Sequence, residues 1–383
     1  MTCSVINFVR YLYSLLENSI LRLLGYRMSS LGQGFQNQLG QGFQGQGQGQ
    51  LGQGLRKCCY SAVSAGAGQA VAVFFRRPDG SIVEAFWRNK QSDWSSFREV
   101  LPKSATPPRN LAIAATLWAN CHYRIYYFDE NMNVCEVSFE SKTEPVSKQL
   151  TGNPRASVSS GISAVCFHAN GPNIRVYYVD ADNKLQANDT WGKETAVEAP
   201  DMHPDTALQF VTLTAWDNDA TEIRGYYQDT SFSIRELTYQ KGAWDQGKPI
   251  QSAKSLIPFA AAVSGAASTS PKVYLYTVNE RNQIVELGKE GIDMQAKWGN
   301  NVSIVSATAA KSLAAIGNSW VEDSADVHIY SSDDVGDNFV HNWKSNGTLV
   351  EQAEIVMFEQ PQVRVIPFKT GSMVTAHITP AAK

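Results

Sequence analysis

The stretch IRGYYQDTSFSIRELTYQKGAWDQG, residues 223–247, is typical of a β-hairpin, because two runs rich in β-branched and aromatic residues flank the polar segment QDTSFS. Arg224 and Glu236 stand twelve residues apart. A hairpin centred near Thr230 would place them opposite each other, with Cβ atoms about 5 Å apart. A guanidinium and a carboxylate together can grip neighbouring hydroxyls of a sugar. A single such pair is more often an ordinary ion pair on a wet sheet.

The same pattern recurs six times along the chain. The positions equivalent to Arg224 are Ala72, Arg124, Arg175, Arg224, Tyr274 and His328, with steps of 52, 51, 49, 50 and 54 residues. Twelve residues after them stand Glu84, Glu136, Ala187, Glu236, Glu286 and Val340. A run of small and apolar residues precedes each hairpin, so each unit has about four short strands. Such repeats of about 50 residues are typical of propeller blades. The sequence therefore predicts an all-β fold, a six-bladed β-propeller of four-stranded repeats.

The Arg-x-Tyr-Tyr-x-Asp hairpin with its Glu, the small-residue strand before it and the aromatic-Gly segment after it resemble the fungal fucose-specific lectins, the Aleuria-type six-bladed propellers. The resemblance covers about residues 60–366. It implies reversible binding of L-fucose in pockets between neighbouring blades. In such a pocket, one blade gives an Arg and a Glu that hydrogen-bond the sugar, and the next blade gives a Trp that packs on it. No cofactor, metal or catalytic residue is expected.

Two pockets match this pattern in full, and four match it in part. The full sets that the resemblance implies are Arg124, Glu136 and Trp191, and then Arg224, Glu236 and Trp298. The third repeat keeps Arg175 with Trp244, but Ala187 replaces the acid, which leaves Gln186 as a neutral substitute. The first and fifth repeats keep the acids Glu84 and Glu286, and the sixth has His328 with Val340 or, after a one-residue shift, His341. Trp94 is a further candidate for the pocket of the sixth blade.

Residues 1–30 lie outside the repeats. Their apolar residues recur at helical spacing and are interrupted by Arg10, Glu17 and Arg22, which favours an amphipathic helix over a signal peptide or a spanning helix. Contact of this helix with a membrane or a partner is one interpretation, and a loosely packed extension is the other.

The rest of the chain divides by composition. Residues 31–55 are rich in Gly and Gln and are expected to form a flexible linker. Residues 56–368 form the predicted propeller, and 369–383 a peripheral tail. The apolar run 363–366 is expected to complete the first blade and so close the ring.

Charge and cysteine content narrow the class of partner. A formal net charge of −3 argues against nucleic acid as the main partner, and fucosylated glycans or glycoproteins are the implied ligands. The six cysteines show no C-x-x-C pair and no spacing shared between repeats, which argues against a zinc site. Free thiols favour a cytosolic or unconventionally secreted protein. The sequence leaves the oligomeric state open.

Two other classes of function stay open. A propeller glycosidase needs two carboxylates that converge on one site, whereas the acids here are spread over separate repeats. A protein-binding propeller of the WD40 or kelch kind carries a Trp-Asp or Gly-Gly pair in each blade. Trp216-Asp217 and Trp244-Asp245 do occur, but at different places in their repeats.

Overall fold

The computed structural model of the chain divides into two compact units, Met1–Gln53 and Gly54–Lys383. The structure describes residues 60–65, 70–88, 94–118, 122–140, 143–167, 173–189, 194–213, 222–240, 242–252, 257–264, 271–281, 283–290, 297–299, 302–306, 312–317, 327–332, 338–345, 348–357, 363–369 and 372–373. The predicted helix 1–30, the predicted linker 31–55 and Trp191 lie outside these residues, as does the side chain of Trp94.

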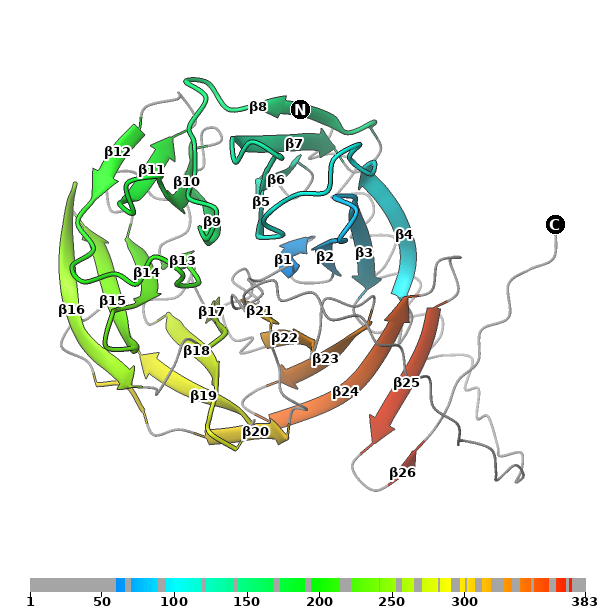
Figure 1. Ribbon diagram of the computed structural model, residues 1–383. Coiled ribbons are helices and arrows are strands. Elements are labelled where there is room, and N and C mark those ends of the chain that lie inside the picture. Colours follow the sequence, from blue (N-terminus) through cyan, green and yellow to red (C-terminus); the bar gives the residue numbers. More distant parts are fainter. Residues whose placement is uncertain are drawn as a thin grey trace, which may run out of the picture. The chain divides into compact units, whose positions relative to one another are not determined.

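Six antiparallel sheets, one per repeat, form a ring of blades in the second unit (Figure 1). Blade 1 consists of β1 (Tyr60–Ala65), β2 (Ala70–Arg76), β3 (Ile82–Arg88) and β4 (Trp94–Leu101), and blade 2 of β5 (Ile113–Trp118), β6 (His122–Phe128), β7 (Val134–Glu140) and β8 (Val146–Gln149). Blade 3 consists of β9 (Ile162–Phe167), β10 (Asn173–Val179), β11 (Leu185–Asp189) and β12 (Glu194–Val197), and blade 4 of β13 (Gln209–Thr212), β14 (Ile223–Gln228), β15 (Ser233–Gln240) and β16 (Ala243–Ser252). Blade 5 consists of β17 (Phe259–Ser264), β18 (Lys272–Val278), β19 (Gln283–Glu290) and β20 (Val302–Ser306). Blade 6 consists of β21 (Ser312–Gly317), β22 (Val327–Ser332), β23 (Asn338–Ser345), β24 (Thr348–Met357), β25 (Val363–Lys369) and β26 (Ser372–Met373). The prediction of a six-bladed all-β propeller is confirmed.

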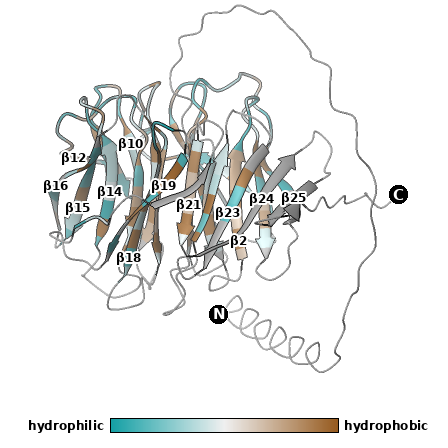
Figure 2. Cartoon of the chain, turned by 90° about the horizontal axis from the view of Figure 1, so that it is seen from below, coloured by the Kyte–Doolittle hydropathy of each residue, from teal (hydrophilic) through white to brown (hydrophobic). Residues whose placement is uncertain are grey.

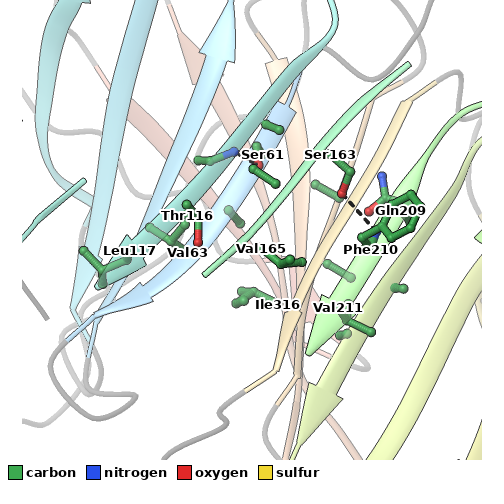
Figure 3. A pocket seen from close by; sticks show the side chains of 18 of the residues that line it. Ser61, Val63, Thr116, Leu117, Ser163, Val165, Gln209, Phe210, Val211 and Ile316 are labelled. Carbon is green, nitrogen blue, oxygen red and sulfur yellow. Dashed lines mark hydrogen bonds between the residues drawn. The ribbon is translucent and has the colours of Figure 1, made fainter. Parts of the chain in front are cut away.

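The small-residue runs of the sequence form the innermost strand of each blade. Together these six strands line a central channel of about 210 Å³. Small side chains are required there because the strands converge on one axis. Figure 3 shows the channel wall, where the amide of Phe210 on β13 donates to the Ser163 hydroxyl on β9 at 2.9 Å. The amide of Ala115 bonds the Ser61 hydroxyl of blade 1 in the same way, at 2.8 Å. Inner-strand serines therefore join adjacent blades.

The second strand of each blade sends alternate residues to the two neighbouring blades. On β6, Ile125 packs in the core between blades 1 and 2, and Tyr126 in the core between blades 2 and 3. This follows from the period of two along a strand. Figure 2 shows the resulting apolar segments, in brown, along strands such as β18 and β21. The face that carries Tyr126 also carries Arg124, so the predicted site residues point at the next blade.

The predicted register of the hairpin was wrong by two residues. Arg224 pairs with Thr238, and Tyr226 pairs with Glu236, so Arg224 and Glu236 are diagonal neighbours on one face. The turn is responsible, because the Asp229 carboxylate accepts the amides of Ser231 and Ser233, each at 2.9 Å. This centres the hairpin one residue later than Thr230, and Arg224 reaches Glu236 obliquely.

The predicted closure of the ring was also wrong. The run 363–366 belongs to β25, which pairs with β24 at the outside of blade 6. All four strands of blade 1 come from residues 60–101. Blades 6 and 1 therefore meet without a shared strand, through packing between groups such as Tyr330, Ala314 and Trp87.

Candidate functional site

In every blade but the first, where Phe74 takes this place, a tyrosine two residues after the marker position frames the site. It pairs across the hairpin with the acid position, as in Tyr126 with Glu136 and Tyr276 with Glu286. The Tyr126 hydroxyl donates to Glu136 at 2.9 Å, and the Tyr276 hydroxyl donates to Glu286 at 2.7 Å. The carboxylate is therefore anchored by its own blade, and the arginine reaches it from the diagonal position.

An open pocket lies between blades 2 and 3, with a volume of about 120 Å³. Blade 2 contributes Arg124, Tyr126, Glu136, Lys148, Leu150 and Thr151, and blade 3 contributes Ile174, Val176, Asn188 and Asp189. The Nε of Arg124 lies 3.6 Å from Oε1 of Glu136. The sequence-predicted pair is thus brought together, in a cavity between two blades.

The charges of this pocket are partly open to solvent. The side chains of Arg124 and Glu136 are 23% and 9% exposed. Lys148, which is mostly exposed, holds its Nζ 3.3 Å from the same Glu136 oxygen. Burial and the Glu136 charge hold the pKa of Tyr126 well above its ordinary value, so this hydroxyl stays a donor. The pocket offers donors, the carboxylates of Glu136 and Asp189, and an apolar wall from Ile174, Val176 and Leu150.

The pocket predicted between blades 4 and 5 has the same residues but is filled. Arg224 donates to Glu236 Oε1 at 3.4 Å, to Thr238 at 2.8 Å, and to Glu222. Lys289 of blade 5 donates to Glu236 Oε2 at 3.1 Å. The Trp298 ring lies edge-on to Tyr226, with centroids 5.9 Å apart. All the predicted members meet here, but Arg224 is only 1% exposed.

At the junction of blades 3 and 4, aromatic side chains surround Arg175. Its guanidinium lies 4.4 Å from the Tyr239 ring centroid and donates to the Tyr239 hydroxyl at 3.2 Å. Trp244 packs on Tyr239, with ring centroids 5.1 Å apart. The resemblance predicted that Trp244 would cover this site, whereas Tyr239 is the ring that contacts the arginine.

The prediction that Gln186 substitutes for the missing acid of blade 3 was wrong. It pairs with Tyr178, one position away from Ala187, so it lies on the opposite face of the hairpin from Arg175. Its amide donates to Asp180 at 2.6 Å in the turn of its own blade. Ala187, opposite Tyr177, occupies the acid position.

Blades 1, 5 and 6 have other residues in place of the Arg–Glu pair. Glu84 pairs with Phe74, and burial raises its pKa although Arg98 opposes the shift. Glu286 keeps the bond from its tyrosine but has Tyr274 in place of arginine. In blade 6, Tyr330 pairs with His341, which confirms the one-residue shift. Nε2 of His341 lies 2.9 Å from Nδ1 of His328.

Within the residues that the structure describes, no group of three or more His, Cys, Asp or Glu is placed to hold a metal ion. In the same part of the chain, no helix has the length and apolar character needed to cross a membrane.

Comparisons with known proteins bear on both the sequence and the six-bladed ring. The family model described as fungal fucose-specific lectin matches residues 44–248, more than half of the chain. The chain belongs to the fungal fucose-specific lectin family. Fucose-specific lectin g276 of Arthrobotrys oligospora is 27% identical over 215 residues, which are 51% of this chain and 53% of that protein. The chain thus spans about half the length of this curated relative.

Solved structures show the same fold. AofleA from Arthrobotrys oligospora superposes with a TM-score of 0.68 at 24% identity, over 82% of this chain and 89% of that one. The Aleuria aurantia lectin, described as a six-bladed β-propeller with a novel fucose recognition mode, gives a TM-score of 0.56 at 18% identity, over 85% and 97% of the chains.

The sequence analysis did not predict three kinds of residue at the inter-blade sites of this protein. The tyrosine partners of Glu136, Glu236 and Glu286 were visible as the recurrent Tyr two residues after the marker. Lys148, Asn188 and Asp189 had no repeated signal. Lys289 and Tyr239 share one position, three residues after the acid position of their own blades, and this position faces the preceding blade.

Proposed function

We propose that this lectin binds L-fucose reversibly in the pocket between blades 2 and 3. The observation that carries the proposal is the meeting of Arg124 and Glu136 in a cavity between two blades of a protein from a fucose-specific family. The Aleuria aurantia lectin, which shares the fold, is described as recognising fucose.

The chemistry of the pocket fits a deoxy sugar. The Arg124 guanidinium donates to ring hydroxyls, and the Glu136 carboxylate accepts from a neighbouring hydroxyl. Tyr126 fixes the carboxylate, so binding does not have to order it. Ile174, Val176 and Leu150 form the apolar side of the pocket, which suits the methyl group and one face of the sugar ring.

Binding occurs without catalysis in this proposal. Glycoside hydrolysis uses two carboxyl groups about 5 to 10 Å apart across one bond. The open pocket is lined by two, Glu136 and Asp189, but Arg124 and Lys148 lie against Glu136 and neutralise its carboxylate. The binding free energy available per ligand atom is limited, and a small neutral sugar has few atoms. One site is therefore expected to bind with a Kd on the order of tens of micromolar or weaker. Binding to a glycan-coated surface is tighter when more than one site or chain engages it, because the first contact raises the effective concentration for the next.

Calorimetric titration of the full chain with methyl α-L-fucoside tests the proposal. Saturable binding that free fucose competes away, and that methyl α-D-mannoside does not reproduce, is the expected result. A glycan array extends the test, because a bound set that includes glycans without fucose would contradict fucose specificity. Binding that free fucose leaves unchanged would favour a protein-interaction function.

Cytosolic or unconventionally secreted localisation is part of the proposal. Cys135 and Cys166, the two cysteines in the described part of the chain, carry free thiols, as expected of a protein that folds without disulfides.

A further inference from the structure

The pockets at blades 2–3 and blades 4–5 share their hairpin residues but differ in access. Arg124 and Arg224 occupy equivalent positions, and so do Glu136 and Glu236. The side chain of Arg124 is 23% exposed and that of Arg224 is 1% exposed. Something other than the Arg–Glu pair therefore decides whether a ligand can enter.

Lys289 is the group that fills the blade 4–5 site. It lies on β19 of blade 5, is 2% exposed, and places its Nζ 3.1 Å from Oε2 of Glu236. The same ammonium lies 5.9 Å from the centroid of the Trp298 ring. Lys289 thus pairs with the carboxylate oxygen, and lies near the aromatic ring, that a sugar would contact.

The filled site is electrically balanced. Arg224 and Lys289 supply two positive charges, and Glu222 and Glu236 supply two negative charges, all at least 95% buried. A buried ion pair that keeps both partners is tolerated, whereas loss of one partner is strongly destabilising. A neutral sugar cannot displace the ammonium without leaving Glu236 with less compensation, so the closed arrangement excludes it.

The same strand position acts at other junctions. Tyr239 of blade 4 stacks on Arg175 of blade 3. Trp87 of blade 1 packs on His328 and His341 of blade 6, with ring centroids 5.0 and 5.7 Å away. Each residue stands three after the acid position of its own blade. In the sequence of blade 3, the residue three after Ala187 is the shorter Thr190, which lies outside the described residues.

We propose that Lys289 closes the blade 4–5 pocket, which is a latent fucose site, and that the residue at this position sets how many pockets of the ring accept sugar. The inference rests on the proposed function of the open pocket. It assigns Lys289 as a specificity-determining residue rather than as a ligand contact.

Stoichiometry of methyl α-L-fucoside binding to the full chain, measured by calorimetry, tests this. Relative to the wild-type number of sites, Arg124→Ala should lose one and Lys289→Thr should gain one. The double variant Arg124→Ala/Lys289→Thr should regain the wild-type number, and adding Arg224→Ala should remove the gained site. Lys272→Thr, which changes an exposed lysine on β18, is the matched control and should leave the number unchanged.

Folding of the variants is checked separately, because Lys289→Thr removes one charge from the buried group. If it fails to fold, Lys289→Thr/Glu222→Gln removes one charge of each sign and keeps the group neutral. A folded variant of either kind without an added site would overturn the assignment, while the wild-type titration would still support fucose binding. Failure of the wild type to bind any fucoside would overturn the proposed function and this inference together.

Discussion

At the scale of single residues, two nearly identical sets of side chains behave differently because their surroundings differ. Glu136 is held by Tyr126, Arg124 and Lys148 at the edge of a cavity. Glu236 is held inside a closed group of charges. The first arrangement leaves hydrogen-bonding capacity for a ligand, and the second uses it within the protein.

Glu136→Gln should weaken fucoside binding at the blade 2–3 pocket by about 10- to 100-fold, since a hydrogen bond to a charged acceptor contributes about 1.5–3 kcal/mol. The amide keeps the size of the side chain, so the unfolding midpoint should change little. Calorimetric titration gives the affinity of this site. Retention of wild-type affinity would show that Glu136 does not contact the sugar.

Glu236→Ala should destabilise the fold by about 3–5 kcal/mol, because two buried cations, Arg224 and Lys289, are then left with only one carboxylate of the group, that of Glu222. Glu136→Ala is the matched control and should cost much less, since Arg124 and Lys148 can turn to water. Urea unfolding of both variants measures the difference. Equal costs would mean that the blade 4–5 charges are open to solvent.

At the scale of elements, each hairpin is set by its turn. Asp129, Asp180, Asp229 and Asn279 each accept backbone amides two and four residues later. In the three turns that begin with an aspartate, the third residue after that aspartate has a positive φ: 65° at Met132, 62° at Asn183 and 64° at Phe232. The turn fixes which residues of the two strands pair, and so where the arginine meets the acid.

Asp229→Ala should cost about 1–3 kcal/mol, because the amides of Ser231 and Ser233 lose their acceptor. Arg235, whose Nε donates to Asp229 at 2.5 Å, also loses its partner. Burial opposes ionisation of Asp229, but its bonds from Ser231, Arg235 and Ser233 together lower its pKa. Chemical unfolding measures the loss. Asp182→Ala, at an exposed position of the blade 3 turn, is the control and should be nearly neutral.

The elements also show how far the sequence could predict this protein. The period of about 50 residues, the strand composition and the Arg–Glu spacing predicted the blades and the two Arg–Glu pairs that face a neighbouring blade. The two-residue error in register arose because twelve residues of separation fit either a direct or a diagonal pairing, and only the turn decides. Gln186 failed for a related reason, since a shift of one residue reverses the face. The contact of Lys289 with Glu236 could not be predicted from the hairpin pattern, because the two residues lie 53 positions apart on different blades.

At the scale of the whole molecule, the described strands of blades 6 and 1 pack against each other without a strand in common. Strand β25 pairs with β24 at the outer edge of blade 6 and does not pair with a strand of blade 1. The closing junction holds His328 and His341, with His341 stacked on Tyr330 at 5.0 Å and Trp87 packed against both imidazoles. Stability of the ring therefore depends on a junction that contains two titratable groups.

Acid should weaken this junction. Burial lowers the pKa of His328 to about 3, and burial with the nearby His328 lowers that of His341 well below its ordinary value. The folded ring keeps both imidazoles neutral, whereas the unfolded chain takes up protons below about pH 6.5. Stability is therefore full above about pH 6.5 and falls toward pH 3, by up to about 1.4 kcal/mol per pH unit for each histidine.

Thermal unfolding between pH 7.5 and 4 measures this, with His328→Gln/His341→Gln as the comparison, since two amides can still bond each other but do not titrate. The wild type should lose more stability across this range than the double variant. Parallel losses in the two proteins would mean that other groups account for the acid sensitivity.

The central claim is that the gap between blades 2 and 3 holds the sugar. Crystals of the full chain soaked with methyl α-L-fucoside test it most directly. The account predicts sugar density in that gap, with hydroxyls in hydrogen-bonding range of the Arg124 guanidinium and the Glu136 carboxylate, and none beside Lys289. An empty blade 2–3 pocket in crystals that bind the sugar elsewhere would contradict it.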